Sequence, residues 1–237
     1  MNKLFCFGNF YIHKIAREDT NFLRHYSLLC YYFHNYCDFF ATFTVAMILD
    51  IHTHNAQTHA QTIDTVGVHP WHAEVCDLAE VELRAPTADA IGEIGLDYAC
   101  DVPREVQMAV FRAQLALAER LEKPIVLHCV RAFDDVVKVL KVYRLKAVIF
   151  HGFIGSKEQA QRAVSQGYHL SFGERTFRSP KTIEAMLSTP LSHLFVETDE
   201  STTPIEVIYA KIAELRGIST AELQQATEEN LKSILNR

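Results

Sequence analysis

Two histidines separated by one residue, His52 and His54, follow a short apolar run at residues 47–49. In an extended strand alternate residues share a face, so Asp50, His52 and His54 would point in the same direction. Taken alone, such a pair is also explained as polar strand-end residues that face solvent. The pair forms a metal-binding corner only if further His, Asp or Glu side chains lie at the ends of other strands.

Imidazole and carboxylate groups do recur at the ends of the other strand-like runs. These residues are His69, Glu93, His128, His151, Glu197 and Asp199. Each one alone has an ordinary explanation as a hydrogen-bonded or solvated residue. Together, four of the histidines with one Glu and one Asp would suit a binuclear metal site, with the Glu bridging. Such nitrogen and oxygen ligands fit zinc, manganese or magnesium, and the sequence does not choose among them.

Short β-rich runs alternate with amphipathic helical stretches from residue 47 onward. The expected strands are residues 48–53, 65–69, 90–96, 124–129, 147–151, 168–172 and 194–198. This alternation predicts a parallel sheet, and runs that are apolar on both faces indicate a sheet covered by helices. We therefore expect an α/β fold, a barrel of about seven parallel strands ringed by helices. In such a barrel the functional groups stand at the carboxyl ends of the strands.

Helix start and stop signals support the same alternation. They are Pro103 before residues 105–121, Ser156 with Gln159 and a stop at Gly167, Ser179-Pro180, Thr203-Pro204 with a stop at Gly217, and Ser219 with Glu222. These signals predict helices between consecutive strands.

Composition limits the kind of protein. The 237 residues are 49% hydrophobic, enough for one enzyme-sized core, and the net charge of −6 argues against a broad basic face that grips nucleic acid. The six cysteines form no CxxC pair, so neither a zinc knuckle nor a disulfide scaffold is expected. The simplest location is a reducing cytoplasm, with no stable membrane association and a monomer favoured.

Residues 1–46 differ from the rest of the chain. They hold more than half of its aromatic residues and three of its six cysteines, without clear periodicity. Residues 27–48 are long enough to span a membrane, but His34, Asn35 and Asp38 lie within them. Our hypothesis is that residues 1–46 are an extension outside the native fold, produced by an upstream start assignment. A membrane anchor, or an added layer for the barrel, remains an alternative.

Several motifs in order resemble those of TatD-family metal-dependent hydrolases. They are Asp50-Ile-His-Thr-His54, Val66-Gly-Val-His-Pro70, Ala90-Ile-Gly-Glu-Ile-Gly-Leu-Asp-Tyr98, Pro124-Ile-Val-Leu-His128, His151-Gly-Phe-Ile-Gly-Ser156 and Glu197-Thr-Asp199. The resemblance covers nearly all of residues 47–237 and none of residues 1–46. It implies a TIM-barrel metallo-hydrolase and, most often in this family, a magnesium- or manganese-dependent deoxyribonuclease that trims single strands from the 3′ end.

The resemblance also implies a role for each matching residue. His52, His54 and Asp199 are expected to hold one metal ion, Glu93 to bridge, and His128 and His151 to hold the second. Asp199 is further expected to act as general base toward the attacking water. Asp97 and Glu197 are expected to orient the ligands. Substrate contacts are expected from His69, Arg131 and Arg175, although His69 could instead pack against Pro70.

Three features depart from the family pattern. About ten residues separate His54 from the next strand, too few for the helix, strand and helix usual there, so a barrel strand is expected to be missing. The arginine that normally follows the His128 motif by two residues stands one position later, at Arg131. The segment after Asp199 lacks the usual long loop with an Arg-Asn-Glu-Pro motif.

Two other functions remain open. A binuclear hydrolase of another ester or amide bond, such as an aminoacyl ester, would use the same machinery, and the acidic charge balance favours it. A barrel that binds metal but has lost activity is the second alternative. Local basic residues near the expected mouth argue for a phosphate-bearing substrate such as single-stranded DNA, namely Arg131, Lys157, Arg175 and Arg178. Trp71, Tyr98, Phe153 and Phe177 lie next to the motifs and could stack on bases.

Overall fold

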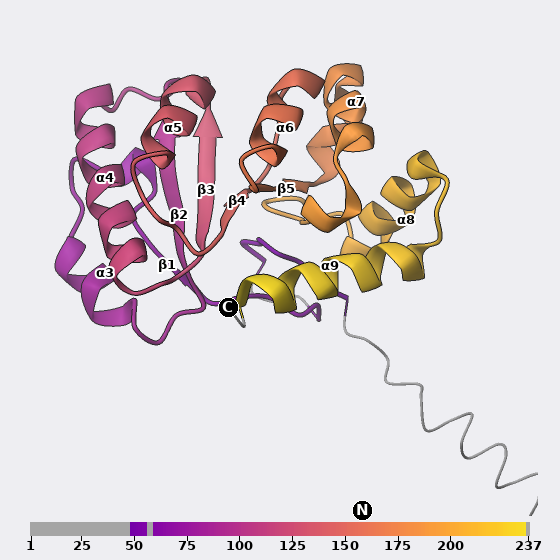
Figure 1. Ribbon diagram of the computed structural model, residues 1–237, viewed down its shortest axis with the longest axis horizontal. Coiled ribbons are helices and arrows are strands. Elements are labelled where there is room, and N and C mark those ends of the chain that lie inside the picture. The colour runs from indigo at the N-terminus through magenta and orange to yellow at the C-terminus, as the bar shows by residue number, and fades with distance from the viewer. Residues whose placement is uncertain (1–47, 56–58, 236–237) are drawn as a thin grey trace, which may run out of the picture. The chain divides into compact units, whose positions relative to one another are not determined.

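The computed structural model describes residues 48–55 and 59–235, within a compact unit that spans Met47–Arg237 (Figure 1). Its elements are β1 (Thr65–Val66), η1 (Pro70–His72), α3 (Leu78–Arg84), β2 (Ala90–Asp97), α4 (Arg104–Arg120), β3 (Ile125–Val130), α5 (Phe133–Leu140), β4 (Val148–Phe150), α6 (Lys157–Val164), β5 (His169–Phe172), η2 (Glu174–Arg178), α7 (Pro180–Ser188), η3 (Leu191–His193), β6 (Leu194–Val196), α8 (Ile205–Arg216) and α9 (Thr220–Leu235). The expectations for residues 1–46 lie outside the described residues.

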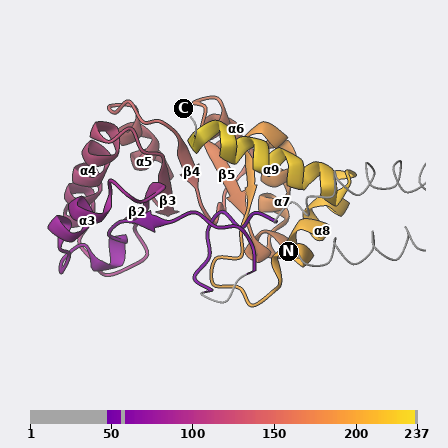
Figure 2. The same cartoon turned by 90° about the horizontal axis from the view of Figure 1, so that it is seen from below.

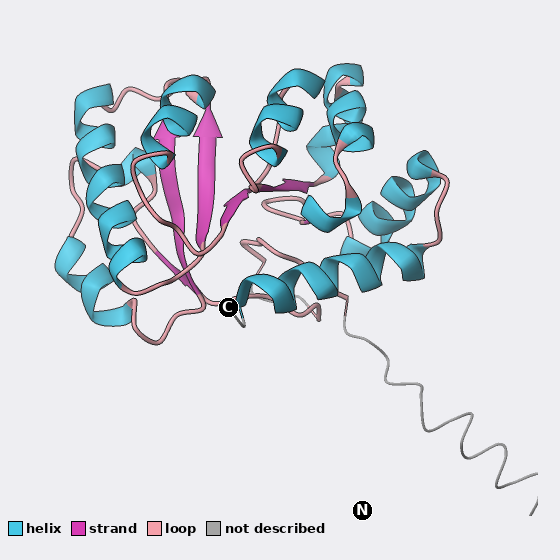
Figure 3. Cartoon of the chain, in the orientation of Figure 1, coloured by secondary structure: helices cyan, strands magenta, loops and turns pink. Residues whose placement is uncertain are grey.

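The six strands form one parallel sheet in chain order, β1 to β6 (Figure 3). Consecutive parallel strands need crossover connections, and helices supply them here. Helices α3, α4 and α5 flank β2 and β3, whereas α6 and α7 lie beside β5 (Figure 1). The expected α/β architecture of parallel strands ringed by helices is confirmed.

The first expected strand, residues 48–53, is replaced by an irregular segment. It makes only two isolated bridges among the described residues, Leu49 with Gln61 and Thr53 with Asp199. Its backbone pairs with the end of β6 through Ile51 N to Val196 O at 3.1 Å and His54 N to Asp199 O at 3.0 Å. The segment therefore takes the place of a seventh strand, but the short connection to β1 leaves it without a full ladder on its other side.

The strands have two distinct apolar faces. The outer face packs against the helices, with Ile125, Leu127 and Phe150 among its fully buried side chains. The inner face forms a separate cluster. Its members are Leu49, Ile51, Ala90, Val126, Ala147, Ile149, Phe195, Leu231 and Ile234. Side chains that alternate between two apolar environments are those of a barrel wall.

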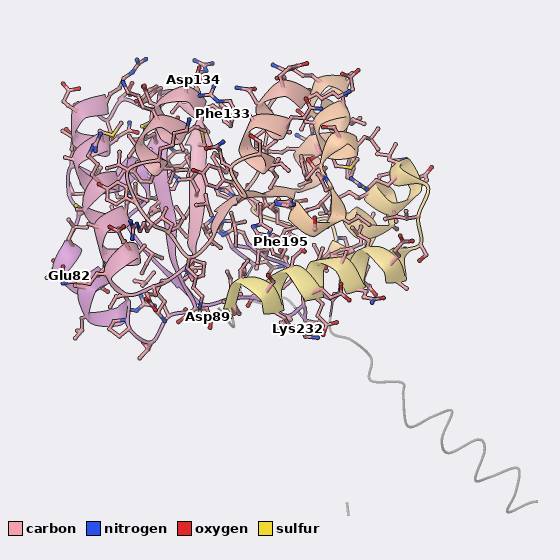
Figure 4. The ribbon with its side chains drawn as sticks, in the orientation of Figure 1. Glu82, Asp89, Phe133, Asp134, Phe195 and Lys232 are labelled. Carbon is pink, nitrogen blue, oxygen red and sulfur yellow. The ribbon has the colours of Figure 1, made fainter. Side chains whose placement is uncertain are left out.

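Helix α9 covers the amino ends of the strands. Seen from below, it runs across them (Figure 2), and Phe195 lies on the side of the sheet next to it (Figure 4). Leu231 and Ile234 of α9 belong to the inner cluster. Asn230 Nδ2 donates to Leu191 O at 2.7 Å and to Leu194 O at 3.0 Å. Apolar packing therefore closes the amino end of the barrel, so a site for substrate can lie only at the carboxyl end.

Most of the helix signals read from the sequence act as expected. Ser156 and Gln159 form a complete capping box, and the Ser179 side chain accepts from Thr182 N. Gly217 ends α8 in the left-handed conformation at φ 66°. Helices α3 and α5 were not among the helices singled out by sequence signals. Within residues 48–55 and 59–235, no helix is both long and apolar enough to cross a membrane.

Candidate metal centre

Three strands place an apolar residue in the inner cluster and, two residues later, a polar residue at the carboxyl end of the barrel. Val126, Ile149 and Phe195 are in the inner cluster, and two residues after them stand His128, His151 and Glu197. Residues two apart in a strand face the same side, so these three side chains point into the barrel at its carboxyl end.

Glu93 reaches the same space through an irregular part of β2. The pairing of β2 with β3 shifts register between Ile91 and Ile94, which brackets Glu93. The two glycines beside Glu93 allow the strands to approach closely. A Cβ on Gly92 would lie 2.7 Å from Val126 Cβ, and one on Gly95, at φ 147°, would lie 1.9 Å from His128 O. Glycine is therefore required on both sides of the Glu93–Ile94 pair.

Five imidazoles surround the Glu93 carboxylate. Oε1 lies 2.5 Å from His151 Nε2, 2.6 Å from His128 Nδ1 and 3.3 Å from His69 Nε2. Oε2 lies 3.3 Å from His52 Nε2 and 3.6 Å from His54 Nε2. Burial opposes ionisation of Glu93, but its hydrogen bonds to the histidines outweigh burial and hold its pKa far below the usual range. Glu93 is thus a carboxylate at the centre of the cluster.

Two further carboxylates lie behind His128 and His151, the first within hydrogen-bond distance and the second at ion-pair distance. His128 Nε2 lies 3.2 Å from Asp97 Oδ2, so its Nδ1 faces Glu93. His151 Nδ1 lies 3.7 Å from Glu197 Oε1, so its Nε2 faces Glu93. A carboxylate behind an imidazole fixes the ring and directs the lone pair of the other nitrogen forward. Asp97 and Glu197 therefore lie where the sequence analysis expected orienting groups.

The region around His151 favours a positive charge. Burial opposes protonation of His151, but Glu197 and Glu93 outweigh burial and raise its pKa to about 10. The pKa of Glu197 is lowered despite burial because His151, His52 and Ser171 stabilise its ionised form.

His52, His54 and Asp199 stand on the other side of Glu93. His52 is buried, and its Nε2 lies 3.3 Å from Glu93 Oε2 without the geometry of a hydrogen bond. His54 is much more open, with 55% of its side chain exposed, and its Nε2 is 3.7 Å from Asp199 Oδ1. Asp199 has a left-handed backbone, at φ 54°, which is uncommon outside glycine and typical of functional sites. Burial and the nearby Glu197 raise the pKa of Asp199.

His69 contacts the cluster but is oriented differently. Its Nδ1 accepts the backbone N–H of Trp71 at 3.2 Å. In a neutral imidazole the proton must then be on Nε2, which faces Glu93 Oε1. His69 is thus set up as a hydrogen-bond donor toward the centre, which agrees better with a substrate contact than with metal ligation.

The side chains around Glu93 suit divalent cations. Three overlapping groups have ligand atoms within 4.8 Å of one another: His52, His151 and Asp199; His52, His54 and Glu93; and His69, Glu93 and His128. A buried imidazole nitrogen without a well-formed hydrogen bond, next to a carboxylate that several histidines share, is what a cation would satisfy. The groups share members, so the geometry does not divide the ligands into the two sets that the family resemblance implies.

The two expected substrate arginines line separate cavities at the mouth. Arg175 borders a cavity of about 300 Å³ beside Asp199, and its Nη1 is 3.9 Å from Asp199 Oδ2. Arg131 borders a cavity of about 510 Å³ beside His151. Both are exposed. Each arginine is therefore placed to meet an anion that enters next to the cluster.

A third cavity, of about 430 Å³, opens where the barrel wall is shortened. It is lined by the irregular segment on one side, including Ile51 and His52, and by Ile63 and Thr65 on the other. Glu93 also lines it. This cavity therefore reaches Glu93 beside the irregular segment.

Hydrogen bonds to which no role was assigned from the sequence join the irregular segment to the residues after β6. The buried Asp50 accepts from Thr198 N at 3.0 Å and from Thr198 Oγ1 at 2.7 Å. Ser171 similarly donates to Glu197 Oε2 at 2.6 Å. The available signal was a polar residue within an otherwise apolar run, as in His169-Leu-Ser171-Phe.

Known proteins share this arrangement of sequence and fold. The family described as TatD related DNase matches residues 39–236. The uncharacterized metal-dependent hydrolase YabD of Bacillus subtilis is 37% identical over 194 residues, covering 71% of this chain and 75% of that protein. The 3′-5′ ssDNA/RNA exonuclease TatD of Citrobacter koseri is 29% identical over 210 residues, covering 76% and 80%. The crystal structure of the TatD homologue YjjV of Escherichia coli matches with a TM-score of 0.68 and 30% identity, covering 74% and 77%.

Proposed function

The chain belongs to the family of TatD related DNases, and we propose that it is a metal-dependent exonuclease that shortens single-stranded DNA from its 3′ end. The observation that supports this proposal is the convergence of five histidines on Glu93, with Asp97 and Glu197 behind two of them.

Six residues would hold two divalent cations, magnesium, manganese or zinc: His52, His54, Glu93, His128, His151 and Asp199. When bound, such ions neutralise charge on a phosphodiester and lower the pKa of water. His69, with Nε2–H directed at the centre, would hold a phosphate oxygen. Arg131 and Arg175 would do the same from the two cavities at the mouth.

Asp199 would serve as the general base. Burial and Glu197 raise the pKa of its carboxyl group, which makes it a better proton acceptor than an ordinary aspartate. In the reaction, water oxygen would bond to phosphorus while a water proton passes to Asp199. The bond to the leaving oxygen would break, and this oxygen would take the bonding pair and a proton from solvent. Asp50 and its bonds to Thr198 would keep the residue next to Asp199 fixed.

The test is hydrolysis of end-labelled single-stranded DNA by the full chain, after chelator treatment, with Mg²⁺, Mn²⁺ or Zn²⁺ added back. We expect stepwise shortening from the 3′ end, lost when metal is withheld. Asp199→Asn should bind metal but lower turnover by roughly two or more orders of magnitude. Glu184→Gln, an exposed change on α7, is the matched control and should leave turnover unchanged.

Three results would each contradict part of the proposal. Shortening from the 5′ end would reject the polarity but keep the nuclease. No cleavage of DNA, together with metal-dependent hydrolysis of a simple or aminoacyl ester, would reject the substrate and keep the hydrolase. Full activity of Asp199→Asn would remove Asp199 from the role of base.

The proposal places this enzyme in the cytoplasm as a monomer. The six cysteines without regular spacing support a reducing compartment. It further assigns the activity to residues 47–237, with residues 1–46 as an extension that plays no part in catalysis. Deleting residues 1–46 should therefore leave kcat/KM for DNA unchanged relative to the full chain.

A further inference from the structure

An exposed aromatic ring stands next to the candidate metal centre. Trp71, in the short helix η1, has 54% of its surface exposed, whereas the residues that precede and follow this helix contact the barrel. Its ring lies 4.8 Å from the His69 ring, edge to face, and 6.4 Å from the His128 ring, between ring centroids. Both histidines contact Glu93.

Trp71 is also fixed in orientation. Its Nε1–H donates to Asp97 Oδ2 at 2.7 Å, and the same oxygen lies 3.2 Å from His128 Nε2. A hydrogen bond to a carboxylate is short and strong, and it holds the indole as a rigid plate. A ring that is already immobilised loses little conformational entropy when a ligand stacks on it.

We propose that Trp71 is the stacking platform for a nucleobase next to the scissile phosphate. This inference rests on the proposed nuclease function and adds a base-binding subsite to it. The Trp71 ring lies 4.8 Å from the His69 ring and 6.4 Å from the His128 ring, so a nucleotide whose phosphate binds beside these histidines would bring its base close to the indole. Each of the four bases has a flat face that can stack, so this subsite would not distinguish among them. It would require the base to be unpaired, and so would favour single strands.

The hydrogen bond to Asp97 offers another role for Trp71, namely to hold the Asp97 side chain in place. The test must distinguish this role from base stacking. If Trp71 served only to hold Asp97, any residue without the N–H would be equally damaging. If it serves as a platform, Trp71→Phe should keep most of the function because a ring remains, whereas Trp71→Leu should lose it. His72→Ala, an exposed change in the same short helix, is the matched control.

The first measurement uses intrinsic fluorescence, because Trp71 is the only tryptophan of the chain. Asp199→Asn protein loaded with Mg²⁺ is titrated with a short oligothymidylate, and with the same oligomer in which the two bases at the 3′ end are replaced by abasic residues. We expect saturable quenching by the first and little by the second. Equal quenching by both would mean that phosphate alone changes the emission, and would overturn the stacking assignment.

The second measurement compares cleavage of the same two oligomers. The wild-type chain should prefer the base-bearing oligomer by roughly 5- to 100-fold in kcat/KM, largely through KM. Trp71→Leu should bring this ratio close to one, and Trp71→Phe and His72→Ala should keep it. Equal cleavage of both oligomers by wild type would overturn the stacking role and leave the nuclease function intact. Cleavage of neither would reject the nuclease function itself.

Discussion

The two sides of the candidate metal centre are built differently. His128 and His151 lie at the ends of regular strands, each has a carboxylate behind it, and only 13% and 6% of their side chains are exposed. His52 and His54 lie on a segment with two isolated bridges, and 55% of the His54 side chain is exposed. The His128 and His151 side chains are therefore enclosed more fully than the His54 side chain, whereas His52 is also buried.

The cause of the difference is the shortened barrel wall. Strands β3 and β4 have partners on both sides, which leaves the ends of these strands little freedom. The irregular segment is held by the end of β6 and by Gln61, and a cavity opens next to it. If the centre holds two ions, as we propose, we expect the ion beside His128 and His151 to bind tightly and the ion beside the exposed His54 to exchange with solvent.

The largest effect is expected from Glu93→Gln, because both sides share this carboxylate. The change should remove metal from both sides and lower activity by more than the roughly 100-fold that loss of an orienting group produces. Elemental analysis after dialysis measures the metal content, with the exposed Glu105→Gln as control. A Glu93→Gln protein that keeps two ions per chain would show that Glu93 does not bridge.

The next prediction compares one histidine from each side. His151→Ala should lose activity that excess metal does not restore, since Glu197 is then left buried without its partner. His54→Ala should lose activity that millimolar metal restores in large part, because its ion is held weakly. Activity as a function of metal concentration measures both. Equal rescue of the two variants would reject the difference between the sides.

A smaller effect is expected from the orienting carboxylates. Asp97→Asn and Glu197→Gln should each weaken metal binding by about 10- to 100-fold, because the imidazoles in front of them lose a fixed orientation. Titration with Mn²⁺ followed by calorimetry measures the affinity. Each variant should weaken only the binding of the ion beside His128 and His151. A weaker affinity of the ion beside His54 would mean that the two sides are not independent.

The smallest effect concerns how the irregular segment is anchored. Tyr209 is fully buried, and its hydroxyl donates to Leu49 O at 2.8 Å and contacts Thr227 Oγ1 at 2.9 Å. Tyr209→Phe should lower the free energy of unfolding by about 1–3 kcal/mol, because Leu49 O is left buried without a donor. Urea denaturation measures this loss. Tyr143→Phe, which removes a long hydrogen bond at the surface, should change stability by less than about 0.5 kcal/mol.

The sequence predicted the regular parts of the fold well. Strands such as β3 and β4 are apolar on both faces, and capping residues such as Ser156 and Ser179 act locally, so a short stretch of sequence is enough to identify them. The sequence did not predict the conformation of residues 48–53. Their apolar pattern is that of a strand, but a strand also needs a neighbouring strand to pair with. Whether residues 48–53 have one on each side depends on the length of the connection between His54 and β1, which their own pattern does not reveal.

The members of the candidate site could be predicted, but the arrangement could not. His128 and His151 follow apolar runs, and this placed them at one end of the barrel. Whether an imidazole binds metal or donates to a phosphate depends on which of its nitrogens already has a hydrogen-bond partner. At His69 this partner is the backbone N–H of Trp71, which bonds to Nδ1 and leaves Nε2 facing the centre. Such contacts come from the path of a loop, which residue types do not specify.

The bond between Asp50 and Thr198 has a consequence for how the protein forms on the ribosome. These partners are 148 residues apart, and the segment that carries His52 finds its strand neighbour only at Val196. Synthesis proceeds from the N-terminus at about 5–20 residues per second, so Asp50 waits on the order of ten seconds for its partner. A nascent chain that ends before β6 holds Glu93, His128 and His151 but lacks Asp199. If Asp199 has the proposed role of general base, the growing polypeptide gains its activity only after its last strand has emerged.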